Sequence, residues 1–453
     1  MRIEDIDGGG VASPQGFRAA GVHAGFRAEA DRLDMALVVA DEPCACAATF
    51  TQNVFCAAPV QVSRAHLNEG GACGEGGPAY GTARAVLVNS GVANAATGER
   101  GLETARASAR LAARVIGCTE QEVLVASTGV IGQHLPLAPF ESGLPLALSA
   151  LSRDGGASAA RAIMTTDTRP KEAACTFTVD ARALSKACGC SETAPATCGN
   201  AAAVSVAGDG SDLPFAPLTF TIGGMSKGAG MIMPNMATMI AVLTTDAPIA
   251  APYLHAALKR AVAVSFNKIT VDSDTSTNDS CFLLASGAAV PRGLAIEPET
   301  PAFAAFEEAL RHVCVALARA MAADGEGATR LVTVRVEGAA SDADADAAAR
   351  TVANSPLVKT AVYGHDANWG RIAAALGRSG ARFNQENVEI SIMGMPVCKG
   401  GLTVPFDEDE ALRRFEAPEI VLDINLGAGN ASATMWTCDF SHDYVTINGD
   451  YRT

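Results

Sequence analysis

A glycine-rich stretch near the middle of the chain leads to a threonine that is a candidate for chemistry. The stretch runs Lys227-Gly228-Ala229-Gly230-Met231-Ile232-Met233-Pro234-Asn235-Met236-Ala237-Thr238-Met239. Glycine and proline disfavour both helix and strand, so this composition predicts a shaped loop. Such a loop, followed by an apolar segment at 239–243, would present the hydroxyl of Thr238 at the mouth of a packed core. Most glycine-rich loops are ordinary turns, and the spacing alone leaves that alternative open.

A second candidate is the pair Thr128-Gly129, which follows an apolar run at 123–127. A strand that ends there would aim a backbone N–H and a hydroxyl at one point, which is what a developing oxyanion requires. An ordinary strand-to-loop turn is the alternative interpretation.

Other segments combine polar and charged side chains without fixing a role. Residues 164–171 follow a predicted helix and are typical of a capping turn. Residues 274–279 have a density of carboxylates and hydroxyls that suits either a divalent metal or hydrogen bonding at a strand end. The spacing of Cys188, Cys190 and Cys198 fits no ligand pattern, so no metal site is predicted.

The central stretch resembles the signature of the ornithine acetyltransferase family, also called bifunctional glutamate N-acetyltransferase, which works in the acetyl cycle of arginine biosynthesis. The resemblance extends to Gly-Phe-Arg-Ala-Ala-Gly-Val at 16–22, Phe-Thr-Gln-Asn at 50–53 and the polar segment at 272–279. It covers nearly the whole chain apart from 184–213. The chain departs from the family pattern at Val92, Ala96 and Ala367.

The resemblance implies roles for individual residues. Thr238 would be both the nucleophile and the site of self-cleavage, which would occur after Ala237. Thr128 and Gly129 would form the oxyanion hole. Among the threonines of 165–168, Thr166 is favoured as a substrate contact. The other implied substrate contacts are Lys227, Thr238, Glu326, Asn448 and Thr453, and the family needs no metal.

The implied reaction is the transfer of an acetyl group from N2-acetylornithine to glutamate through an acetyl-threonine intermediate. No cofactor is expected, and the use of acetyl-CoA as an additional donor is left open. The expected partners are these small molecules and the two fragments of the chain, two copies of each. A related self-processing aminopeptidase or amidase is one alternative. Another is a non-catalytic protein that binds an anion in a nest formed by Lys-Gly-Ala-Gly.

Alternating apolar runs and helical patterns predict the elements of a layered α/β fold. Strands are expected at 34–40, 85–91, 123–127, 268–272, 331–336, 388–393 and 420–426. Helices are expected at 102–116, 156–163, 253–265, 303–321, 342–353 and 371–376. A loop is expected at 8–25, and a surface excursion at 184–213.

The resemblance implies a two-lobed fold of the α/β/α type. Its N-terminal lobe, 1–237, would carry the oxyanion hole. Its C-terminal lobe, 238–453, would carry the nucleophile and bind substrate.

Composition limits the classes to which this chain can belong. Its 453 residues are 49 % hydrophobic and 18 % charged, which favours a globular enzyme with a sizeable core in two domains or lobes. The formal charge of −15 argues against a nucleic-acid partner. No apolar run is long enough to cross a bilayer, so no membrane partner is expected. The expected location is the cytoplasm. The 13 cysteines contain no Cys-x-x-Cys pair and are expected to act as small core residues in a reducing compartment.

Overall fold

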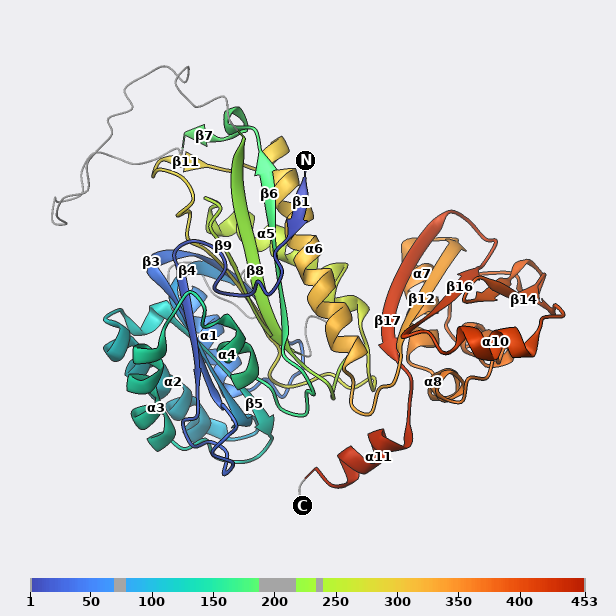
Figure 1. The fold of residues 1–453 in the computed structure, drawn as a ribbon, viewed down its shortest axis with the longest axis horizontal. Helices are drawn as coiled ribbons and strands as arrows, with labels where there is room; N and C mark the ends of the chain where they lie inside the picture. Colours follow the sequence, from blue (N-terminus) through green and yellow to red (C-terminus); the bar gives the residue numbers. More distant parts are fainter. Residues whose placement is uncertain (1, 69–78, 187–216, 234–238, 452–453) are drawn as a thin grey trace.

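Two lobes make up the protein in the computed structural model, which describes residues 2–68, 79–186, 217–233 and 239–451. The larger lobe contains the chain as far as about residue 330, and the smaller lobe follows it (Figure 1). The last helix, α11 (His442–Gly449), leaves the smaller lobe and runs back beneath the larger one (Figure 1). The chain therefore returns, near its end, to the lobe in which it began.

A nine-stranded mixed sheet is the framework of the larger lobe. Its strand order is β1 (Ile3–Asp5), β6 (Lys171–Val179), β8 (Leu218–Lys227), β9 (Ile240–Thr245), β10 (Ser280–Ala285), β3 (Met35–Phe50), β4 (Tyr80–Val92) and β5 (Val123–Val130), with β2 (Phe17–Val22) also paired to β3. Most neighbours are antiparallel, whereas β9 with β10 and β4 with β5 are parallel. A separate pair is formed by β7 (Ser185–Lys186) and β11 (Leu294–Ala295).

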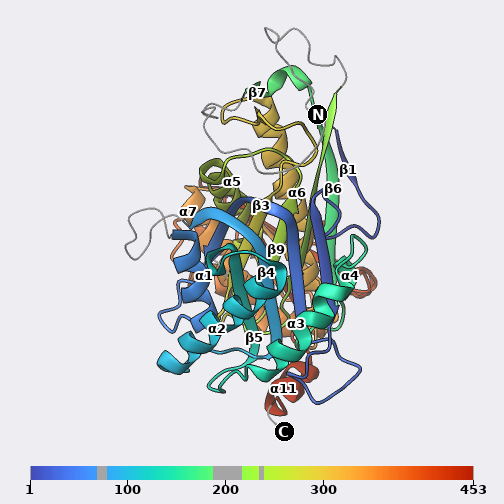
Figure 2. The same cartoon turned by 90° about the vertical axis from the view of Figure 1, so that its left-hand side faces the viewer.

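The long strands β3 and β4 bend, so the sheet curls around an inner core (Figure 2). Successive side chains of a strand point to opposite faces, and Val38 accordingly joins the inner core whereas Leu37 joins an outer one. The inner core receives Leu124 from one half of the sheet and Phe282 from the other. Both halves of the sheet therefore enclose the same apolar layer.

Helices cover the outer face of the curled sheet. On the half that contains β4 and β5, α2 (Gly98–Ile116) and α3 (Ala138–Ala150) form one core with the strands. On the half that contains β6 and β8, α5 (Ala251–Ala263) and α6 (Pro301–Ala323) form another. The shorter α1 (Ala58–Asn68) and α4 (Gly156–Ala162) contribute to the inner core.

The smaller lobe is a six-stranded sheet with helices packed against it. The strand order is β15 (Leu402–Thr403), β14 (Met395–Lys399), β13 (Glu389–Ile392), β16 (Glu419–Asn425), β12 (Leu331–Ala339) and β17 (Ala431–Cys438). Its helices are α7 (Asp342–Ala353), α8 (Pro356–Tyr363), α9 (Trp369–Gly377) and α10 (Glu408–Arg414). Trp436 and Cys438 of β17 join the core that contains α6, and so connect the two lobes.

Short 3-10 helices lie at Glu120–Glu122, Ala181–Ala183, Phe266–Lys268 and Gln385–Asn387. Within the described ranges, no helix combines the length and the apolar content that crossing a bilayer requires. Cys46, Cys175, Cys281 and Cys314 are fully buried, as expected of cysteines that act as small core residues.

The predicted layered α/β fold with two lobes is confirmed, and the curled sheet supplies two of its layers. The strand expected at 268–272 is wrong, because Ile269 makes only an isolated bridge to Trp436 and the backbone then crosses to Ile232. The loop expected at 8–25 is also wrong in part, since it contains β2. Most of the predicted excursion at 184–213, including Cys188, Cys190 and Cys198, lies outside the described residues.

The proposed division of the chain between residues 237 and 238 does not follow the boundary between the lobes. It falls between β8 and β9, which are neighbours in the large sheet. The two fragments remain a prediction. In the fold they would share one sheet.

Candidate active site

A pocket of about 300 Å³ opens at the ends of the strands β5 and β8. Every predicted site residue that the structure describes lines this pocket: Thr128, Gly129, Thr166, Lys227, Glu326 and Asn448. Ile232 and Met239, which flank the segment 233–238 in the sequence, line it too. The predicted residues Ala237, Thr238 and Thr453 lie outside the described residues.

Thr128 and Gly129 lie near the end of β5, where this strand runs parallel to β4. Gly129 pairs with Gly91, and its φ of 132° lies in the region that favours glycine. A β-carbon at position 129 would overlap the backbone carbonyl group of Gly91. Glycine at position 129 therefore allows β4 and β5 to approach closely. It also leaves the backbone at the end of β5 facing the pocket.

Asn278 fixes the end of β5 from the side. Its Nδ2 donates to the carbonyl oxygens of Ser127, over 2.9 Å, and Ala93, over 2.5 Å. Its Oδ1 accepts from the hydroxyl of Thr277 over 2.6 Å. The polar segment at 274–279 thus contributes hydrogen bonds at the ends of strands, which is one of the two roles that its composition suggested.

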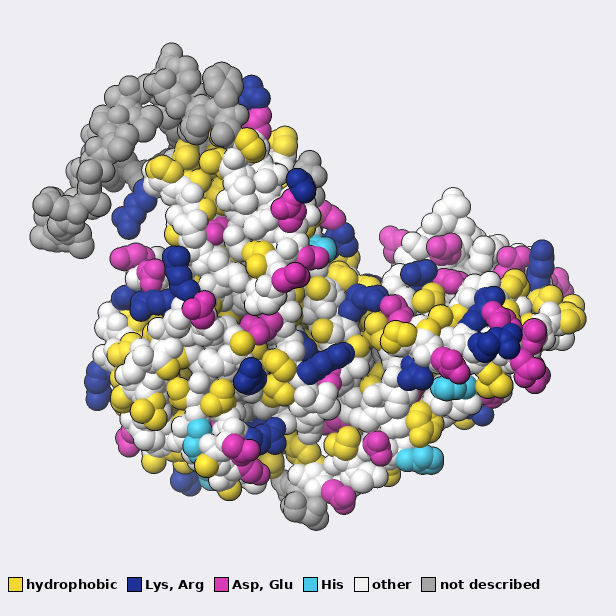
Figure 3. Space-filling view, in the orientation of Figure 1, with side chains coloured by type: hydrophobic (Ala, Val, Ile, Leu, Met, Phe, Trp, Pro, Cys, Tyr) yellow, Lys and Arg dark blue, Asp and Glu magenta, His cyan; other side chains and the backbone are white. Residues whose placement is uncertain are grey.

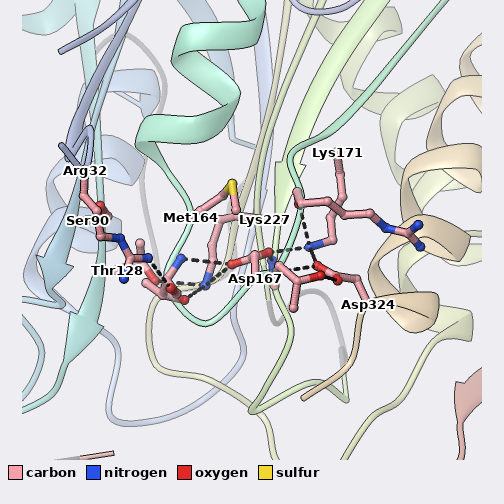
Figure 4. Close-up of polar contacts among 12 residues, drawn as sticks. Arg32, Ser90, Thr128, Met164, Asp167, Lys171, Lys227 and Asp324 are labelled. Carbon is pink, nitrogen blue, oxygen red and sulfur yellow. Dashed lines mark hydrogen bonds and ion pairs between the residues drawn. The ribbon is translucent and has the colours of Figure 1, made fainter. Parts of the chain in front are cut away.

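Lys227 is the last residue of β8 and is 8 % exposed. Its Nζ donates to the hydroxyl oxygen of Thr165 over 2.7 Å and to that of Thr128 over 3.3 Å. It lies 3.9 Å from Oδ2 of Asp167 (Figure 4). The lysine therefore contacts both the candidate oxyanion hole and the loop that follows α4.

Behind Lys227 lies a buried ionic cluster, formed by Asp167, Lys171, Asp324 and Lys227 itself (Figure 4). The Nζ of Lys171 lies 2.6 Å from a carboxylate oxygen of Asp167 and 2.5 Å from one of Asp324. Two cations and two anions balance within the cluster, so each buried charge has an opposite charge nearby. Thr168 also donates to Asp324 through its hydroxyl.

The surroundings of the cluster shift the ionisation of its members. Burial favours the neutral form of Asp167, but Lys227 and Lys171 outweigh it and hold the pKa of this carboxyl below its ordinary value. Burial lowers the pKa of Lys227, and the negative charge of Asp167 opposes that change. The charged state of Lys227 thus depends on Asp167.

Two arginines hold the loop at 164–168 in place. A guanidinium nitrogen of Arg27 donates to the carbonyl oxygen of Met164 over 3.0 Å, and one of Arg32 donates to that of Thr165 over 2.9 Å. Within the loop, the backbone N–H of Thr165 donates to Asp167 over 3.0 Å. Thr165 therefore contacts Lys227, and both Thr165 and the next threonine, Thr166, line the pocket.

Glu326 supplies a carboxylate to the lining of the pocket. Its backbone N–H donates to the carbonyl oxygen of Ala229, and its Oε2 accepts from Nδ2 of Asn448, both over 2.8 Å. A side chain at Gly230 would overlap the Glu326 carboxylate, so glycine makes room for it. Gly230 of the central stretch thus leaves space for the Glu326 side chain.

Asp272 anchors the described part of the central stretch. Its two carboxylate oxygens accept from the backbone N–H groups of Met231, over 2.6 Å, and Ile232, over 2.7 Å. Met231 has a φ of 56°, which is uncommon for a residue with a side chain. This carboxylate therefore stabilises a backbone shape that the sequence alone does not favour.

Sequence patterns indicate no specific role for Asp167, Lys171, Asp324, Asp272 or Arg27. Asp167 and Lys171 lie in the polar segment 164–171, which was interpreted as a capping turn. The high density of polar and charged residues in this segment was the available signal for the ionic cluster. Asp324 lies shortly after the helix predicted at 303–321. Asn368, next to the departing position Ala367, caps α9 in the smaller lobe.

On the face shown in Figure 3, lysine and arginine side chains are interspersed with aspartate and glutamate. By contrast, Lys227 in the pocket and Lys171 in the ionic cluster behind it are buried, with exposed fractions of 8 % and 2 %. A buried ammonium, a carboxylate and strand-end donors around one pocket on a layered α/β fold define an enzyme active site.

Comparison with known proteins agrees with this class. The model of the ArgJ family matches residues 18–198 and 211–453. The arginine biosynthesis bifunctional protein ArgJ of Symbiobacterium thermophilum is 45 % identical over 447 residues, covering 98 % of this chain and 99 % of that protein. The protein of the same name from Chlorobaculum tepidum is 43 % identical over 451 residues, covering 100 % and 99 %.

The crystal structure of ornithine acetyltransferase from Mycobacterium tuberculosis, complexed with ornithine, is 33 % identical. It covers 52 % of this chain and 100 % of that chain, with a TM-score of 0.39. The chain belongs to the ArgJ family, which confirms the resemblance found in the sequence.

Proposed function

We propose that this protein transfers the acetyl group of N2-acetylornithine to glutamate, giving ornithine and N-acetylglutamate. The observation that carries the proposal is the pocket itself, which combines strand-end donors, a buried ammonium and a carboxylate. Met239, the residue after the proposed nucleophile Thr238, lines that pocket. The relatives from Symbiobacterium and Chlorobaculum, named for arginine biosynthesis, support the same assignment.

The first step in this proposal is self-cleavage. The hydroxyl oxygen of Thr238 attacks the carbonyl carbon of Ala237, the C–N bond breaks, and the amide becomes an ester. Water then hydrolyses the ester and leaves Thr238 with an α-amine. The unperturbed pKa of an α-amine is about 7.7–8.0, so near neutral pH this amine serves as the general base of its own hydroxyl.

The mature threonine then carries the acetyl group. Its oxygen attacks the acetyl carbonyl carbon of N2-acetylornithine while the α-amine takes the hydroxyl proton. Thr128 and Gly129 stabilise the resulting oxyanion, and ornithine leaves with a proton. The amine of glutamate attacks the acetyl ester next, which releases N-acetylglutamate and restores the threonine.

Two charged side chains of the pocket suit these substrates. The ammonium of Lys227 attracts a substrate carboxylate, and the carboxylate of Glu326 attracts the side-chain ammonium of ornithine. Thr166, Asn448 and Thr453 complete the substrate contacts in this proposal. The reaction as written requires no cofactor.

Finer features belong to the same proposal. Acetyl-CoA serves as an additional acetyl donor, in keeping with the word bifunctional in the names of the relatives. The fragments 1–237 and 238–453 assemble with two copies of each, in the cytoplasm. Acetylation of glutamate with acetyl-CoA as the only donor tests the first of these features.

The decisive experiment is a mass spectrum of the products formed from N2-acetylornithine with and without glutamate. Transfer predicts N-acetylglutamate only when glutamate is present. Release of acetate and ornithine without glutamate at the same rate would instead indicate a self-processing aminopeptidase or amidase. An intact chain that forms neither product would indicate an anion-binding protein.

A further inference from the structure

The contacts of Lys227 exceed what attraction of a substrate carboxylate requires. Its Nζ donates to Thr165 and Thr128, and it forms an ion pair with Asp167 at 3.9 Å. The lysine therefore connects the loop at 164–168 to the candidate oxyanion hole (Figure 4).

The direction of the hydrogen bond between Lys227 and Thr128 follows from their chemistry. An ammonium has three hydrogens and no lone pair, so Thr128 must be the acceptor. The single hydrogen of the Thr128 hydroxyl is then left to point elsewhere, and Thr128 lines the pocket. A neutral amine would have a lone pair and would compete for that hydrogen.

Asp167 is itself held firmly, which makes it suited to a positioning role. Its Oδ1 accepts from Nζ of Lys171 over 2.6 Å and from the backbone N–H of Gly228 over 2.7 Å. Its Oδ2 accepts from the backbone N–H of Thr165 over 3.0 Å. The side chain that faces Lys227 thus cannot turn away without losing several hydrogen bonds.

We propose that Asp167 and Thr165 hold the ammonium of Lys227 as a donor to the Thr128 hydroxyl, which directs the hydrogen of that hydroxyl at the reacting carbonyl oxygen. Asp167 and Thr165 are positioning residues in this proposal, because they act through Lys227. The proposal rests on the proposed function in one respect, namely that Thr128 stabilises the oxyanion of acetyl transfer.

The charged groups that face Lys227 set its protonation state. They are Asp167 on the loop after α4, Lys171 on β6, Glu326 after α6 and Asp279 before β10. Asp167 is the largest favourable influence among them and opposes the lowering of the Lys227 pKa by burial. Loss of its charge should therefore make Lys227 lose its proton at a lower pH.

A direct test is the titration of Lys227 by NMR in the full-length protein labelled with 13C at the lysine ε-carbon. The label reports on few positions, which are Lys171, Lys186, Lys227, Lys259, Lys268, Lys359 and Lys399. The spectrum of Lys227→Met assigns the resonance. In Asp167→Asn the midpoint for Lys227 should fall by about one pH unit or more, and an unchanged midpoint would overturn the proposal.

The pH profile of acetyl transfer separates positioning from a general loss of structure. In Asp167→Asn the alkaline limb of kcat should move to lower pH, with a smaller effect on KM. Thr168→Val is the matched control, since it lies on the same loop and contacts Asp324 rather than Lys227. Equal effects of both variants at every pH would show that the cluster only supports the fold.

A double-mutant cycle keeps the proposal testable if Asp167→Asn does not fold. Thr165→Val is nearly isosteric and removes one acceptor of Lys227. It should lower kcat about tenfold in the wild-type background and have no further effect in the Thr128→Ala background. Additive effects would contradict a role that acts through Thr128.

Failure of the proposed function would be recognised separately. If the wild-type protein forms no N-acetylglutamate from N2-acetylornithine, that function is wrong. The lysine titration of the same samples still decides whether Asp167 controls Lys227.

Discussion

The Nδ2 of Asn448 donates to Oε2 of Glu326 over 2.8 Å, and so fastens the last helix of the chain to the loop that follows α6. Helix α11 buries none of its side chains. Its position beneath the larger lobe therefore depends on polar contacts, among them the contact from Tyr444 to Asp272 over 3.4 Å, and on the stacking of Tyr444 against Phe440.

Asn448→Ala should impair catalysis much more than stability. Loss of a hydrogen bond to a charged group corresponds to about a tenfold fall in kcat/KM for N2-acetylornithine. The free energy of unfolding should change by no more than about 0.5 kcal/mol, because the residue is exposed. Val445→Ala, on the same helix and 72 % exposed, is the control and should keep full activity. Equal kinetics for both variants would remove Asn448 from the site.

Gly129→Ala should disrupt the end of β5. The new β-carbon would overlap the backbone of Gly91, and the backbone would also retain an unfavourable positive φ. We expect transfer to fall by at least about 100-fold, as for the loss of an oxyanion donor. Gly132→Ala, also at positive φ, meets no atom within 4 Å and should cost only about 1–3 kcal/mol of stability. Activity and thermal unfolding of both variants check this expectation.

Thr238 should be needed for both self-cleavage and transfer. Thr238→Ala should leave a single chain on denaturing electrophoresis and form no N-acetylglutamate. Thr238→Ser retains a hydroxyl and loses only the methyl that restricts χ1, so it should still cleave and retain some transfer. N-terminal sequencing of the smaller wild-type fragment should begin at Thr238. An acetyl group trapped on another residue, such as Cys281, would show that the threonine mechanism is wrong.

Lys171→Met should destabilise the fold strongly at neutral pH. It would leave Asp167 and Asp324 without their shared cation, and breaking a buried ion pair in this way costs about 3–5 kcal/mol. The lowered pKa of Asp167 means that its ionic contribution is present above its unfolded pKa, about 3.9, and is lost as the pH falls through the folded value. The difference between variant and wild type should therefore narrow below about pH 4. Denaturant unfolding between pH 7 and 3 measures it, and Lys259→Met, at an exposed position, is the control.

Local patterns predicted the elements that present the site but not the contacts among them. An apolar run before Thr128 was enough to predict β5, and the helix predicted at 102–116 ends where α2 ends. The ionic cluster could not be predicted, because Asp324 lies 153 residues from its partner Lys171 in the sequence. Distant pairing of this kind depends on the tertiary fold.

The two errors in the predicted elements have the same origin. Residues 17–22 become β2 because they pair with β3 along their full length, which outweighs their weak local preference. Residues 269–272 alternate like a strand, yet the buried Ile269 and Val271 contact separate segments and have no continuous neighbour. Tertiary context decided both cases.

Because β8 and β9 are neighbours in the sheet, self-cleavage between them would affect whether an unfolded molecule can refold. These strands pair from Ile222 with Thr245 to Lys227 with Ile240, and a cut after Ala237 would fall between them. Before the cut, refolding is an event within one chain; after it, two chains must find each other, so recovery depends on concentration. A mature molecule that unfolds at cellular dilution would then rarely reassemble. The proposed maturation would thus make the lifetime of the enzyme depend on its unfolding rate rather than on an equilibrium.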